Sequence, residues 1–250
     1  MNDATSYERF PNAPIVEALL DIRVELPATT TLETLKGFAA HAKDRFPTEE
    51  QQQVLTAQFH LSGERVATDS RRHERGFLHA SEDGTRMVQA RLDGFTVNHL
   101  EPYNDWPELC ADAKEYWARY IEVASPTAIT RIALRFVNRI LLPLPITELK
   151  DFVLTAPDIA PGAPQSLAGY EMQLLLTDEE NEANIAVSQK AFVSPTTPDQ
   201  LPLLFDIDVF AIGSFPTEGP ELWERFDRLR AAKNRVFFES LTERTKEMFR

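Results

Sequence analysis

Residues 129–142 read ITRIALRFVNRILL, and the alternation of apolar and polar positions in this stretch predicts a long, half-buried strand. Its apolar positions on one face are Ile132, Leu134, Phe136 and Ile140. Arg131, Arg135 and Arg139 recur at every fourth residue, so a strand presents all three on the other face, about 13 Å apart. We therefore expect a central strand that carries a row of guanidinium groups on its solvent side.

A second alternating stretch, from Pro14 to Leu26, carries a row of opposite sign. Glu17, Asp21 and Glu25 recur every fourth residue, with Arg23 between them. If this strand lies beside residues 129–142, the two rows can pair across the strands. Such a ladder stabilises by about 0.2–1 kcal/mol per pair without any ligand. Alternatively, the arginines anchor an anionic partner, because guanidinium groups bind carboxylate and phosphate in a bidentate manner.

The rest of the chain repeats one order of elements twice. In residues 1–124, the first strand is followed by a helix near 31–46, strands at Gln58–Ser62, Phe77–Ser81, Arg86–Leu92 and Phe95–Glu101, and a helix at Trp106–Val123. In residues 125–250, the central strand is followed by a short helix at Ile146–Val153, strands at Tyr170–Thr177, Asn184–Phe192 and Leu203–Ala211, and a long helix at Pro220–Phe249. We expect an α+β fold in which a duplicated strand-helix-meander-helix unit forms one continuous domain. Its curved antiparallel sheet should carry the helices on one face.

Three segments together carry a family resemblance: Asn12–Ala18 (NAPIVEA), Thr130–Ile140 and Phe237–Thr242. Nearly end to end, the chain resembles a sporadically distributed bacterial family of uncharacterised proteins. The resemblance brings no catalytic residues with it, and the patchy distribution of the family implies a mobile-element or defence context. The order of elements also resembles the saddle of the TATA-binding protein, a likeness of topology that does not transmit function.

The composition narrows the partners and the compartment. The chain has 39 acidic and 26 basic residues and a net charge of -13, which disfavours general nucleic-acid binding. Cys110 is the only cysteine, so no intrachain disulfide forms. The opening residues show no signal-peptide pattern, and no stretch approaches the roughly 18 apolar residues that cross a bilayer. We expect a cytoplasmic protein without a membrane partner.

Further polar residues are candidates for a site. Asn138 falls on the apolar side of its strand, where its amide either makes a structural hydrogen bond or contacts a ligand. Asp206 and Asp208 share a strand face and, with Glu171, could bind a divalent cation. The histidines lack zinc-ligand spacing, and no glycine-rich phosphate loop or nucleophile elbow occurs, so no cofactor is expected.

These observations favour a non-enzymatic binding or adaptor protein. Its polar sheet face or its C-terminal helix would hold another protein or a small anionic molecule. The alternatives are a metal-dependent hydrolase or nuclease that uses the carboxylates, and an acidic DNA mimic. Trp223 and Phe238 widen the apolar stripe of the last helix, which indicates either a homodimer or a broad sheet beneath that helix.

Overall fold

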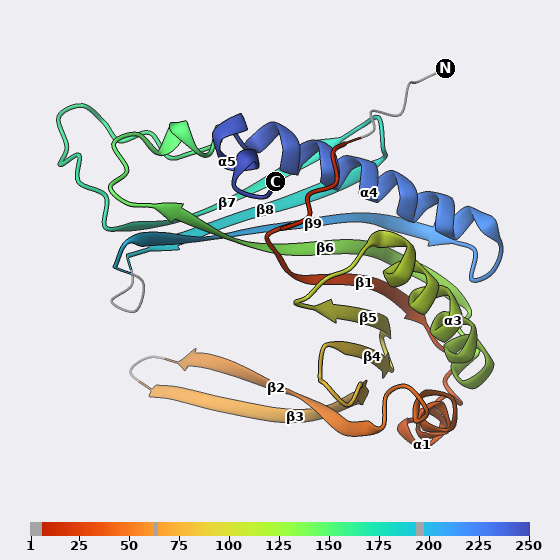
Figure 1. Ribbon diagram of the computed structural model, residues 1–250. Coiled ribbons are helices and arrows are strands. Elements are labelled where there is room, and N and C mark those ends of the chain that lie inside the picture. Colours follow the sequence, from red (N-terminus) through yellow and green to blue (C-terminus); the bar gives the residue numbers. More distant parts are fainter. Residues whose placement is uncertain (1–6, 63–64, 194–197) are drawn as a thin grey trace.

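The computed structural model describes the backbone of residues 7–62, 65–193 and 198–250, and their side chains except those of residues 54–73. In this part of the chain, nine strands form one sheet in the order β2-β3-β4-β5-β1-β6-β9-β8-β7 (Figure 1). Every pair of neighbouring strands is antiparallel. The expectation of an α+β fold with an antiparallel sheet is therefore confirmed.

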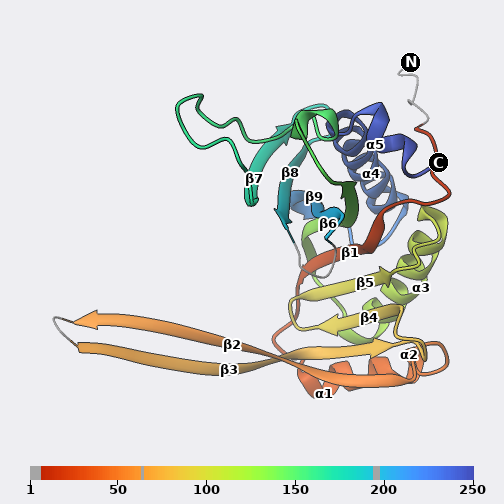
Figure 2. The same ribbon diagram turned by 60° about the vertical axis from the view of Figure 1, so that its left-hand side comes forward.

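The elements of the first half are β1 (Ile15–Glu25), α1 (Leu32–Leu35), the 3-10 turn η1 (Lys36–Phe38), α2 (Ala39–Ala42), β2 (Thr48–Ser62), β3 (Arg65–Ala80), β4 (Arg86–Arg91), β5 (Gly94–Leu100) and α3 (Trp106–Ala124). Thr31 and Asp105 cap α1 and α3, because their side chains accept hydrogen bonds from the backbone N–H groups of the first turns. The strands expected at 58–62 and 77–81 are parts of longer ones. β2 and β3 form a ribbon that projects beyond the rest of the sheet (Figure 2).

The elements of the second half are β6 (Ala128–Pro143), the 3-10 turn η2 (Leu149–Asp151), β7 (Gly169–Asp178), β8 (Ala183–Phe192), β9 (Gln200–Phe215), α4 (Pro220–Ser240) and α5 (Glu243–Glu247). Two predicted helices were wrong. The helix expected at 146–153 is only the three-residue turn η2. The last helix does not run to Phe249, because Leu241 is extended and bridges Val153, after which Thr242 caps the separate helix α5.

The two charged strands of the sequence are neighbours at the middle of the sheet. β1 pairs with β6 so that Leu19 lies opposite Arg135, and Asp21 opposite Ala133. β5 lies on the other side of β1, and β9 on the other side of β6. Odd-numbered residues from 17 to 23 on β1 and from 131 to 137 on β6 therefore share one face of the sheet.

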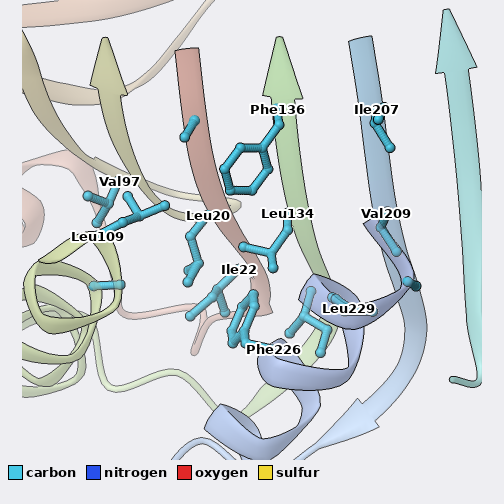
Figure 3. Packing of buried hydrophobic residues seen from close by; sticks show 14 of the residues in the cluster. Leu20, Ile22, Val97, Leu109, Leu134, Phe136, Ile207, Val209, Phe226 and Leu229 are labelled. Atoms are coloured by element: carbon cyan, nitrogen blue, oxygen red, sulfur yellow. The ribbon is translucent and has the colours of Figure 1, made fainter. Parts of the chain in front are cut away.

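The opposite face of the same strands is the core. Leu20 of β1 and Leu134 of β6 are fully buried, and Phe226 and Leu229 of α4 pack over this region (Figure 3). Burial of one such side chain stabilises the fold by about 1.5–3 kcal/mol. Figure 2 shows α3 and α4 on the same side of the sheet. The arginine row of β6 therefore points away from these two helices.

Residues of the same chain contact Phe238 and Trp223, the two aromatic residues that widen the apolar stripe of the last helix. The ring of Phe238 stacks on Tyr7, with 4.5 Å between centroids, and on Phe10, with 5.5 Å. Trp223 lies against Phe226, and Lys114 of α3 lies over its ring. The width of the apolar stripe is thus accounted for within one chain.

In the described part of the protein, no helix is both long and apolar enough to cross a membrane.

Candidate functional site

A groove of about 580 Å³ lies on the sheet face that points away from α3 and α4. It is centred on β1 and β6 and bordered by β4, β5 and β9, and its lining residues are Glu17, Leu19, Asp21, Arg23, Gln89, Arg91, Thr96, Asn98, Arg131, Ala133, Arg135 and Asp208. Ala133, whose short side chain is only 1% exposed, forms part of the floor of the groove. The groove contains four of the residues that the sequence singled out, Glu17, Asp21, Arg131 and Arg135, and also Asp208 from the metal hypothesis.

The arginine row is paired chiefly with carboxylates of β9. Arg135 donates from Nε and Nη2 to Asp206, at 2.9 and 2.6 Å, in a bidentate pair. Arg131 donates from Nη2 to Asp208 at 3.1 Å and from Nη1 to Asp21 at 3.4 Å. The sequence interpretation had placed these pairs between β6 and β1, and only the longer bond to Asp21 follows that expectation.

Arg139 lies outside the groove lining, although it belongs to the same row. Its Nη2 donates to Oε2 of Glu101 at 2.9 Å, and both side chains are at least half exposed. An exposed pair of this kind contributes about 0–1 kcal/mol. Arg139 is therefore separate from the charged network of the groove.

Asp21 is the centre of that network. It is 5% exposed and accepts hydrogen bonds from Arg91 Nη2 at 2.6 Å, Thr96 Oγ1 at 2.7 Å and Arg23 Nε at 2.9 Å. Burial raises the pKa of this carboxyl, but the charges of Arg91 and Arg23 and the hydrogen bonds from Arg91 and Thr96 together outweigh burial, so the pKa lies below its ordinary value. Asp21 therefore stays ionised at neutral pH.

Sequence reasoning missed how far the network extends toward β3. Asp93, in the turn before Gly94, accepts from Arg75 Nη2 at 3.0 Å and from Arg91 Nε at 3.1 Å, and it also pairs with Arg23. In the sequence, Asp93-Gly94 between two alternating stretches is a hairpin signal, and a hairpin signal does not indicate an ion pair. The sequence offers one indication of this extension, because Arg91 is a charged residue on the polar side of a predicted strand. In the structure Arg91 is 3% exposed.

Asn138 does not belong to the groove. It is 1% exposed and faces the core, where its Nδ2 donates to the backbone oxygen of Phe205 at 2.9 Å. This bond satisfies a buried amide that would otherwise cost about 1–3 kcal/mol. Of the two roles that the sequence left open, the geometry matches the structural hydrogen bond.

The three carboxylates of the metal hypothesis are not brought together. Asp206 and Asp208 share the open face of β9, but they accept hydrogen bonds from Arg135 and Arg131. Glu171 lies on β7 and pairs with Lys190 of β8, the strand that separates it from β9. Among the described residues, no group of three histidine, cysteine or acidic side chains is placed to hold a metal ion.

The pKa of Asp208 is shifted in the opposite direction to that of Asp21. Burial raises its pKa by more than Arg131 and Arg135 lower it, so the pKa of Asp208 lies above its ordinary value. The burial of this carboxylate is thus not fully compensated by its neighbours.

Comparison of the chain with protein-family models and with curated proteins found no match.

Proposed function

We propose that the chain is a binding or adaptor protein that holds another protein against the groove face of its sheet. The observation that carries this proposal is the Arg–Asp network at the bottom of an open groove. Buried ion pairs of this kind add little net stability, because desolvation offsets most of the attraction. Donors and acceptors that are already held in place do, however, lower the entropy lost when a partner binds.

Two further features favour a protein partner on this face. On the C-terminal helix, the other surface considered from the sequence, Phe238 already stacks on Tyr7 and Phe10 of the same chain. The β2–β3 ribbon projects away from the side that α3 covers, so it enlarges the face on which the groove lies (Figure 2). A small anion fits less well, because Arg131 and Arg135 already hold carboxylates.

Affinity capture from the native host tests this proposal. The tagged wild-type chain is compared with Arg135→Ala, which removes a groove cation, and with Arg119→Ala on α3 as a matched control. Both arginine side chains are 45% exposed, and both are ion-paired, Arg135 with Asp206 and Arg119 with Glu122. We expect a partner that the wild type and Arg119→Ala retain equally and that Arg135→Ala retains about tenfold less.

The proposal fails if the three baits capture the same proteins in the same amounts. Circular dichroism of each bait confirms that the chain is folded before the comparison is made.

We expect the interaction to occur in the cytoplasm, and cell fractionation of the host tests that location.

We also infer that residues 1–124 and 125–250 derive from one duplicated unit, with helices on one face of the sheet. The support is the strand order, in which the first strands of the halves, β1 and β6, pair at the centre and β5 and β9 flank them. The last long helix of each half, α3 or α4, also follows the strands of that half. A superposition of β1, β5 and α3 on β6, β9 and α4 that fails to align all three elements contradicts the duplication.

A further inference from the structure

Glu17 differs from the other carboxylates of the groove in forming no ion pair, although the charge of Arg135 acts on it from a longer distance. Asp21 and Asp208 each pair with arginine. In the described part of the chain, no lysine, arginine or histidine nitrogen lies within ion-pair distance of Glu17, whose one hydrogen bond comes from an amide. Glu17 therefore faces the groove as a carboxylate without an ion pair among the described residues.

A chain of amides holds Glu17 in one orientation. Gln89 Nε2 donates to Asn98 Oδ1 at 3.1 Å, and Asn98 Nδ2 donates to Glu17 Oε1 at 2.7 Å. Arg91 Nη1 donates to Gln89 Oε1 at 3.4 Å, so each donor in the chain points toward Glu17. One carboxylate oxygen is thus fixed, while Oε2 accepts no hydrogen bond from the described residues and remains available to a ligand.

The surroundings of Glu17 favour a guanidinium group as that ligand. A guanidinium presents forked N–H donors that match a carboxylate, and Leu19 provides apolar surface beside it for the methylene groups of the incoming side chain. The net charge of -13 attracts basic partners to the whole protein.

We propose that Glu17 anchors an arginine side chain that the protein partner inserts into the groove. The inference rests on the proposed function and assigns the chemistry of the partner at this position. In the bound state the arginine takes the Oε2 side of Glu17, while Asn98 keeps Oε1. Arg131 and Arg135 retain their carboxylates on β9, so no existing pair has to break.

Titration of the isotope-labelled full chain with acetyl-arginine-amide, followed by NMR, tests the anchor without the partner. The side-chain amide signals of Asn98 and Gln89 report on Glu17 directly. We expect these signals to shift in a saturable manner, and we expect acetyl-citrulline-amide, whose neutral urea replaces the guanidinium, to leave them unchanged. Glu17→Gln should weaken binding by about tenfold or more, because it removes a hydrogen bond to a charged group.

Glu25→Gln, at the exposed end of the same strand, is the matched control and should bind as the wild type does. Equal binding by Glu17→Gln and wild type overturns the anchor, as do shifts that are scattered over the acidic surface. Tighter binding of spermidine than of the arginine derivative at Glu17 also overturns it, because the site then serves a free polyamine.

The two proposals fail in different ways. If Arg135→Ala releases the captured partner but Glu17→Gln does not weaken the titration, the binding face stands and the arginine anchor is wrong. If capture does not respond to Arg135→Ala, the proposed function itself fails, and the anchor fails with it as a contact to a protein partner.

Discussion

Replacement of Lys233 by methionine is expected to stabilise the protein. Lys233 lies on the buried side of α4 and is 9% exposed. Its Nζ lies 4.1 Å from the ring centroid of Phe136 and 5.9 Å from that of Phe237, and no carboxylate among the described residues pairs with it. Methionine keeps the length of the side chain and removes the amine from the apolar surroundings.

The pKa of Lys233 sets the magnitude of this effect. Burial, with a smaller contribution from Arg230, lowers the pKa from 10.5 to about 7. Since a tenfold change in proton affinity corresponds to about 1.4 kcal/mol, the charged amine is destabilised in the folded chain by roughly 5 kcal/mol at most. The cation–π contacts are lost in the variant, so the net gain at neutral pH is expected at about 1–4 kcal/mol.

The pH dependence separates this reasoning from a simple packing effect. Because the folded pKa lies below the unfolded one, the unfolded chain binds more protons between pH 7 and 10.5, and wild-type stability should rise with pH in this window. The advantage of Lys233→Met should therefore shrink as the pH rises.

Urea unfolding followed by circular dichroism, near neutral pH and again two to three pH units higher, measures both quantities. Lys43→Met, at an exposed position after α2, is the control and should change stability little at either pH. A Lys233→Met variant that is less stable than the wild type, or whose advantage does not depend on pH, refutes the reasoning.

Three further predictions concern the network and the packing of the chain. Asp21→Asn leaves Arg91 buried without its closest counter-ion and should cost about 3–5 kcal/mol in the free energy of unfolding at neutral pH. Because the folded pKa of Asp21 is lowered, the cost should disappear as the pH falls below 3.8 through that pKa; a cost that persists in acid contradicts the assignment. Gly94→Ala should cost more than about 2 kcal/mol, because φ is +153° and a Cβ would lie 2.1 Å from the backbone oxygen of Ile22, while Gly162→Ala, with open space around it, should be neutral in the same melts. Phe238→Ala should cost about 1–3 kcal/mol without changing the mass seen by light scattering, and unchanged stability with a halved mass would instead indicate a dimer contact.

The strands could be predicted where one face is buried and the other is not. On β1 and β6 most even-numbered residues lie in the core and most odd-numbered residues lie on the groove face, although Leu19 and Ala133 are apolar and Ile129, beside a register shift, is buried. The length of β3 could not be predicted, since residues 65–76 contain few apolar residues. The end of α4 was missed although Thr242 followed by Thr245 is a capping signal, because the apolar positions continue past the break at helical spacing.

The site was predictable in part of its residues but not in its pairs. Four-residue spacing placed Arg131 and Arg135 on one face, and alternation placed Asp206 and Asp208 on one face of another strand. Which strands are neighbours depends on the whole sheet, so the sequence could not show that β6 lies between β1 and β9. A long guanidinium side chain also reaches diagonally across strands, as Arg135 does when it binds Asp206 rather than Asp208 opposite it.

The central position of the β1–β6 pair has a consequence for synthesis of the chain. β1 emerges from the ribosome before β6 and can pair with β5 of its own half, but its other edge stays unpaired until residues 128–143 have been made. An open strand edge with an apolar face invites pairing with other chains. During translation this edge of β1 is therefore open to pairing with other chains until β6 covers it, and the far edge of β6 is covered in turn by β9.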